Sequence, residues 1–75
     1  MTRKFRFYLT LSPAECRQYY EGFYKSIQVV AHTGQRIQFP AEHIRSFVTT
    51  SGINGLFELE LESNNKFKSL QKLSN

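Results

Sequence analysis

The chain has 75 residues and a net charge of +4, and its only cysteine is Cys16. This length suits one small domain of marginal stability, spanning residues 1–75, and a single cysteine excludes an internal disulfide. No apolar run reaches the roughly 18 residues of a membrane span and no signal-peptide pattern is present, so we expect a cytoplasmic protein. Seven Phe and four Tyr favour a dense aromatic core as the source of stability and leave self-association open as a second source.

The first predicted strand covers residues 4–11, in which apolar and polar side chains alternate strictly. A period of two over eight residues is typical of a half-buried strand. The odd-numbered residues should face the core. The outward set is then Lys4, Arg6, Tyr8 and Thr10.

A short helix should follow over residues 13–21. Ser12 fits its N-cap, Pro13 suits the first helical position, and Glu15 completes a capping box. Gly22 should end the helix in the left-handed conformation. The side chains expected to pack on the sheet are Cys16, Tyr19, Tyr20 and Phe23.

Residues 27–31 and 35–39 predict a hairpin around a three-residue turn. Such a turn usually ends with a left-handed residue, and Gly34 stands at that position. The resulting pairs are Ile27 with Phe39 and Val29 with Ile37 on one face, and Gln28 with Gln38 on the other.

Residues 57–62 and 66–69 predict a second hairpin of the same design, with Asn65 as the left-handed residue. The expected pairs are Leu61 with Phe67 on one face, and Glu62 with Lys66 and Glu60 with Lys68 on the other. The three carboxylates of Glu58, Glu60 and Glu62, called the Glu comb below, are therefore expected to form a solvated, charge-paired surface.

Between the hairpins, residues 40–47 favour one or two turns of α or 3₁₀ helix, and residues 49–52 a loop. The fourth strand should span residues 53–62, with Gly55 as a bulge or a point of close approach. Residues 70–75 are either a strand end or a frayed turn.

These elements have the order β-α-β-β-α-β-β and predict an α+β domain. We expect a small open antiparallel sheet of about five strands with one helix packed on it. The alternative is a sheet that curls toward a small barrel around Phe39, Phe57 and Phe67.

Several segments are similar to a family of short bacterial proteins built from a domain of unknown function. They are RIQFPAEHIR (36–45), FVT (47–49), GI (52–53), Gly55, FEL (57–59) and NNKF (64–67), with YYEG (19–22) at the helix end. One departure is Ser46, where the family pattern has Pro. The resemblance implies a small single-domain bacterial protein and supplies no catalytic residue.

The sequence favours a protein without catalytic activity, cofactor or metal. Cys16 lies on the apolar side of its helix, which is typical of a buried thiol rather than a nucleophile. His32 and His43 have no third ligand at metal-binding spacing. No phosphate-binding glycine loop or nucleophile motif is present.

Two binding functions remain. The first is a protein-interaction module, which could self-associate, because Val30 and Leu56 fall on outward positions and Tyr24 follows the helix stop. The second is binding of nucleic acid or another polyanion through a basic exposed sheet face. Its candidate residues are Arg3, Lys4, Arg6, Tyr8, His32, Arg36 and Gln38.

Overall fold

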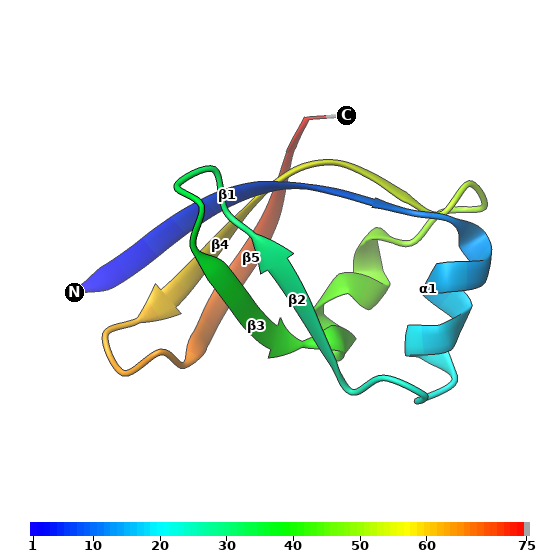
Figure 1. Cartoon of the computed structure of the whole chain (residues 1–75), viewed down its shortest axis with the longest axis horizontal. Coiled ribbons are helices and arrows are strands. Elements are labelled where there is room, and N and C mark those ends of the chain that lie inside the picture. Colours follow the sequence, from blue (N-terminus) through cyan, green and yellow to red (C-terminus); the bar gives the residue numbers. More distant parts are fainter. Residues whose placement is uncertain (75) are drawn as a thin grey trace.

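The computed structural model describes residues 1–74 as mostly antiparallel strands with a little helix (Figure 1). In chain order the elements are β1 (Thr2–Leu11), α1 (Pro13–Tyr20), β2 (Ser26–Val30), β3 (Arg36–Pro40), the 3₁₀ helix η1 (Ala41–Phe47), β4 (Ile53–Glu62) and β5 (Phe67–Ser74). The strands form a three-stranded sheet of order β1-β4-β5 and a separate two-stranded sheet of β2 and β3.

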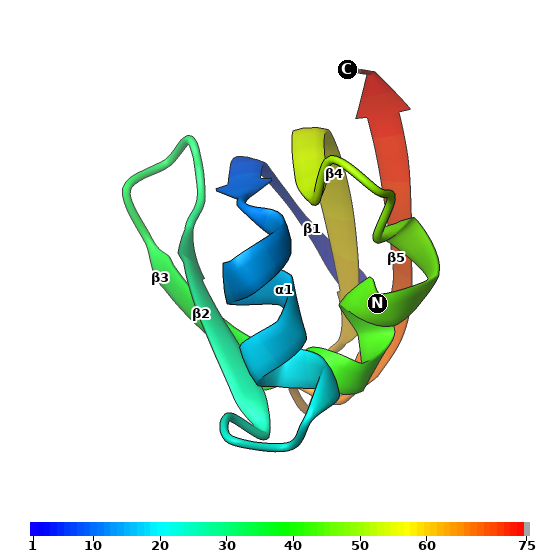
Figure 2. The same cartoon turned by 90° about the vertical axis from the view of Figure 1, so that its right-hand side faces the viewer.

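The expectation of one five-stranded sheet with a single helix is therefore wrong, and the strands within residues 1–74 close no barrel. The physical reason lies in α1, because a helix of eight residues cannot cover the apolar face of five strands. Instead the β2–β3 hairpin turns its own apolar face toward the three-stranded sheet. Figure 2 shows the hairpin and the β4–β5 ribbon on opposite sides, with α1 and η1 closing one end.

The core lies between the two sheets and is aromatic at its centre. Phe7, Phe39 and Phe57 are at most 3% exposed. The Phe7 ring stacks on Phe57 at 6.0 Å between centroids, and it lies 6.1 Å from the ring of Phe39 in the other sheet. The predicted inward faces of β1, β2, β3 and β4 are thus confirmed, including Val29, Ile37, Leu59 and Leu61.

The start of α1 is as predicted, whereas its far end differs. Ser12 and Glu15 form a reciprocal capping box, with hydrogen bonds of 3.1 and 3.0 Å. The helix ends at Tyr20, and Gly22 has the expected positive φ of 82°. However, Tyr20 and Phe23 are 50% and 72% exposed, so the prediction that they pack on the sheet is wrong. The left-handed turn at Gly22 takes the chain out of the helical periodicity before Phe23 is reached.

Both hairpin turns are confirmed, with φ values of 89° at Gly34 and 68° at Asn65. All predicted pairs of the β2–β3 hairpin are present. In the second hairpin Leu61 pairs with Phe67, but Glu60 pairs with Ser69 instead of Lys68. Lys68 is the extra residue of a bulge, which the alternating pattern alone could not reveal.

The segment from residue 70 onward was predicted to be either a strand end or a frayed turn. It is a strand as far as Ser74, and Asn75 lies outside the described residues. A side chain at Gly55 would meet the Ser74 carbonyl oxygen at 2.5 Å, so the predicted close approach is confirmed. Within residues 1–74, neither helical segment has the length and apolarity needed to cross a membrane.

Candidate protein-binding surfaces

The seven residues of the predicted basic face do not form one surface. The structure separates them into a charge-compensated pair, an aromatic pair and a cleft. The pair on β1 is Lys4 and Arg6, the aromatic pair is Tyr8 and His32, and the cleft holds Arg3, Arg36 and Gln38.

The cations of β1 face the Glu comb of β4. Lys4 is paired with Glu60 and Arg6 with Glu58 across the two strands. The Arg6 Nε lies 3.0 Å from Glu58 Oε2, which is hydrogen-bonding distance. Because β1 and β4 are neighbours, the outer face of the three-stranded sheet carries alternating charges of both signs. It does not carry a cationic surface.

Glu60 lies at the centre of this outer face. Its carboxylate accepts a hydrogen bond of 2.6 Å from the Thr2 hydroxyl and one of 3.4 Å from Ser69, and it lies 3.6 Å from Lys68 Nζ. The hydrogen bond from Thr2, followed by the charges of Lys68 and Lys4, holds the pKa of Glu60 below its ordinary value. The predicted pair of Glu60 with Lys68 is thus present as an ion pair between the side chains, although the bulge removes it from the strand register.

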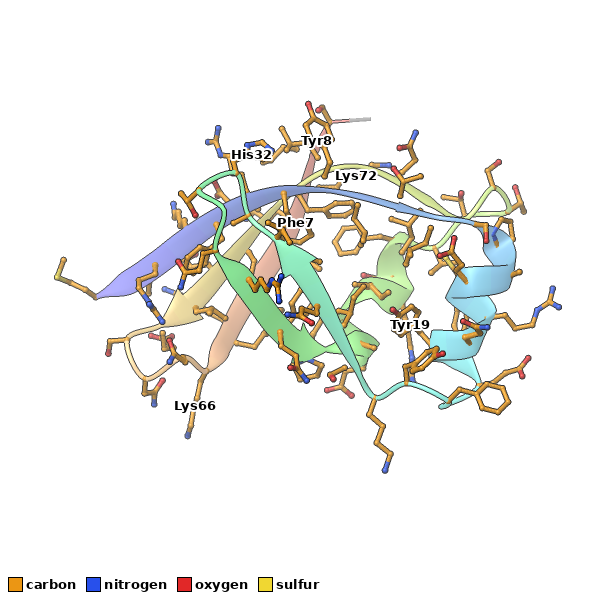
Figure 3. The ribbon with its side chains drawn as sticks, in the orientation of Figure 1. Phe7, Tyr8, Tyr19, His32, Lys66 and Lys72 are labelled. Carbon is orange, nitrogen blue, oxygen red and sulfur yellow. The ribbon has the colours of Figure 1, made fainter. Side chains whose placement is uncertain are left out.

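Tyr8 and His32 meet where the hairpin tip touches β1 (Figure 3). The backbone N–H of His32 donates a 2.8 Å hydrogen bond to the Arg6 carbonyl oxygen. The two rings lie 5.5 Å apart at 36°, and Tyr8 is 68% exposed. This contact joins the two sheets at one point and leaves a single tyrosine ring open to solvent beside the compensated charges.

A cleft of about 250 Å³ lies between β3, the beginning of β1 and the β4–β5 turn. It contains three of the predicted residues, and sequence reasoning missed the others because they come from separate elements. The lining residues are Arg3, Phe5, Gln35, Arg36, Ile37, Gln38, Leu61 and Asn65. Gln38 also donates to the Ser26 hydroxyl at 2.7 Å, which fixes its amide on the outer face of the hairpin.

A second surface, which we call the aromatic loop, comprises residues 20–24 at the end of α1. Tyr20, Phe23 and Tyr24 are 50%, 72% and 51% exposed. The loop is nevertheless held in place, because the N–H of Phe23 donates to the Gln18 carbonyl oxygen at 3.1 Å. The Tyr24 ring also lies 5.5 Å from that of Tyr19.

Two shallow hollows flank Tyr24 in the aromatic loop. One, of about 400 Å³, is lined by Gln18, Phe23 and Tyr24. The other, of about 350 Å³, lies toward η1 and is lined by Gly22, Tyr24, Lys25, Pro40, Ala41, Glu42 and Arg45. Of the other residues that suggested an interaction surface, Val30 is 58% exposed and Leu56 is half-buried opposite Tyr8.

Two of the residues considered in the sequence as a nucleophile or a metal ligand, Cys16 and His43, pack against other parts of the chain. Cys16 is 2% exposed, and burial raises the pKa of its thiol, which is the opposite of what a nucleophile needs. The His43 ring stacks on Phe67 at 3.5 Å between centroids. Among residues 1–74, no three side chains of His, Cys, Asp or Glu gather where a metal ion could be held.

Comparison with known proteins agrees with the resemblance found in the sequence. No curated protein and no solved structure matches the chain. A family model described as "Protein of unknown function (DUF2835)" matches residues 3–73, which is nearly the whole length. The chain therefore belongs to this family of unknown function.

Proposed function

We propose that this protein is a non-catalytic protein-interaction module that binds through the aromatic loop, and that a second copy of the chain is a partner it binds there. The observation that carries the proposal is the exposure of Phe23, which at 72% is the most exposed Phe or Tyr side chain of the described residues. Tyr and Phe side chains are enriched in protein interfaces, because they bury a large area at a low cost in side-chain entropy.

Self-complementarity supports a second copy as the partner. The exposed Phe23 ring lines one of the two hollows beside Tyr24, and the second hollow is lined by Tyr24 and residues toward η1. In a two-fold dimer each protomer would place its Phe23 into the hollow of the other, so one loop supplies both halves of the contact. The hollow toward η1 is lined by residues of both charges, namely Lys25, Arg45 and Glu42. In a two-fold dimer the cations of one protomer could therefore pair with the carboxylate of the other.

The association should be weak and reversible. A fully buried aromatic side chain contributes roughly 150–250 Å², and the three rings of the loop are already partly covered. They cannot supply the roughly 800 Å² per partner of a standard stable interface. We therefore expect a dissociation constant of the dimer between about 10 µM and 1 mM, the range of weak affinities.

Sedimentation equilibrium tests this proposal. The wild-type protein should show a concentration-dependent monomer–dimer equilibrium, and Phe23→Ala should shift it to monomer. Tyr8→Ala is the matched control, because Tyr8 is similarly open but lies on β1, beside His32 and outside the loop. A wild-type protein that stays monomeric up to about 1 mM would contradict the proposal. Dimers that Phe23→Ala leaves unchanged would contradict it as well.

Nucleic-acid binding through the basic face has less support. Lys4 and Arg6 lie opposite Glu60 and Glu58, so a phosphate backbone approaching β1 would meet carboxylates. Among the described residues of this face, the exposed rings are those of Tyr8 and His32, which contact each other and so offer one small area for base stacking. A mobility shift with single-stranded oligonucleotides that weakens with salt and with Arg6→Ala would favour this function over the first.

A further inference from the structure

The cleft between β1 and β3 differs from the rest of the molecule in its charge. Arg3 and Arg36 line it, and no carboxylate does. The other polar residues of the lining are Gln35, Asn65 and Gln38, whose amide nitrogen already donates to the Ser26 hydroxyl. Among the described residues, neither arginine takes part in an ion pair, whereas Arg6 on the neighbouring face does. The cleft therefore has donors for an anion and no internal anion to occupy them.

Arg3 is held over the floor of this cleft. Its guanidinium carbon lies 5.6 Å from the centre of the Phe5 ring, which is the distance of a cation–π contact. Phe5, Ile37 and Leu61 form an apolar floor and are 9%, 6% and 6% exposed. A planar guanidinium in a fixed place can bind a carboxylate with two parallel hydrogen bonds.

Two open strand edges flank the cleft. The Arg6 carbonyl accepts its hydrogen bond from His32 on the edge of β1 that faces away from β4. Backbone groups alternate along a strand, so those of Lys4 point to the same open edge. In the hairpin, the Ala31 N–H donates to the Gln35 carbonyl oxygen, so the backbone groups of Gln35 point toward β2. Because these groups alternate along the strand, those of Arg36 and Gln38 point away from β2.

We propose that this cleft binds an extended acidic segment of a partner protein. One carboxylate of the segment is held between Arg3 and Arg36, a neighbouring apolar side chain rests on the floor of the cleft, and the backbone of the segment pairs with an open strand edge. The volume of about 250 Å³ is below the roughly 300–1,000 Å³ of sites for drug-sized ligands, which suits a short segment.

A peptide fits this cleft better than a nucleic acid does. Single-stranded nucleic acids need exposed rings on which their bases stack. The only aromatic residue in the lining is Phe5, which is 9% exposed and lies beneath the Arg3 guanidinium. The phosphate-binding groups are therefore present without a stacking surface.

Fluorescence anisotropy with a labelled octapeptide of alternating Glu and Leu tests the inference. We expect binding that weakens about tenfold or more when Gln replaces Glu in the peptide, and by a similar factor in the double variant Arg3→Ala, Arg36→Ala, because each loses charge-assisted hydrogen bonds. Arg17→Ala is the matched control, since Arg17 is an exposed arginine on α1 outside the cleft. Thermal melting of the double variant checks that it is folded.

Three results would overturn the inference: no binding at about 50 mM salt, equal binding of the Gln peptide, or tighter binding of a single-stranded oligonucleotide at the same cleft. The inference does not depend on the proposed self-association. Phe23→Ala should leave peptide affinity unchanged, and the double arginine variant should leave the monomer–dimer equilibrium unchanged, so the two proposals fail separately.

Discussion

The outer face of the three-stranded sheet and the aromatic loop are both exposed. They differ in whether their side chains already have partners within the chain. On the sheet, Glu58 pairs with Arg6, and Glu60 accepts hydrogen bonds from Thr2 and Ser69. On the loop, the rings of Phe23 and Tyr24 remain half or more open. Water solvates paired charges at little cost, whereas exposed apolar rings gain free energy when another surface covers them. The charges of Glu58 and Glu60 are thus already paired within the chain, whereas the aromatic area of the loop is left for the proposed association to cover.

The largest effect separates aromatic residues of the core from those of the loop. Phe57→Ala removes a ring that is 1% exposed and should lower the free energy of unfolding by about 3–5 kcal/mol. Phe23→Ala should change it by less than about 0.5 kcal/mol. Urea denaturation of both variants measures the difference. A loss of several kcal/mol in Phe23→Ala would show that this ring is part of the core.

A second substitution tests whether the loop is held in shape for binding. Gly22 has a φ of 82°, and a Cβ added there would meet no other atom within 4 Å, so Gly22→Ala should cost only about 1–2 kcal/mol of conformational strain. Because Phe23 follows directly, the variant should also weaken self-association. Gly52→Ala is the control. It has a similar φ of 92° and should cost more, because the new Cβ would collide with the Leu11 carbonyl oxygen. Equal losses of stability in the two variants would contradict this assignment.

The local features of the fold could be predicted from the sequence, and the long-range ones could not. The capping box at Ser12 and the hairpin turns at Gly34 and Asn65 depend on residues within a few positions of each other. The pairing of β1 with β4 joins Lys4 to Glu60, and no local pattern specifies which strands become neighbours. That missing pairing is the reason why the Lys4 and Arg6 side chains were expected to be an open cationic surface.

The candidate sites follow the same division. The exposure of Tyr24 after the helix stop was predicted, because Gly22 marks the stop in the sequence. The exposure of Phe23 was not, because helical periodicity was extended past that stop. The cleft could not be predicted as a unit, since Arg3 and Arg36 come from two sheets whose relative position only the tertiary packing sets.

A smaller effect is expected on the charged face. Arg6→Ala removes an ion pair whose arginine side chain is 60% exposed, and exposed pairs contribute at most about 1 kcal/mol. The variant should therefore melt close to the wild type, and the difference should shrink further at high salt. A loss well above this value would mean that the outer face contributes to stability as the core does.

The smallest expected effect is a pH dependence from Glu60. Its pKa in the folded protein is lowered from an ordinary value of 4.5, first by the Thr2 hydrogen bond. The stabilisation is thus present in full above about pH 4.5 and is lost as the pH falls through the folded pKa. Glu60→Gln should flatten this part of the curve of melting temperature against pH, with Glu21→Gln as an exposed control. A wild-type curve that rises as the pH falls below 4.5 would contradict the sign.

The most direct test of the aromatic loop as the contact surface is a series of ¹H–¹⁵N correlation spectra recorded at increasing protein concentration. Amide signals of residues 18–25 and of the adjoining part of η1 should shift progressively, while those of the outer sheet face stay in place. Shifts centred on β1 and β4, or spectra that do not change with concentration, would contradict the account.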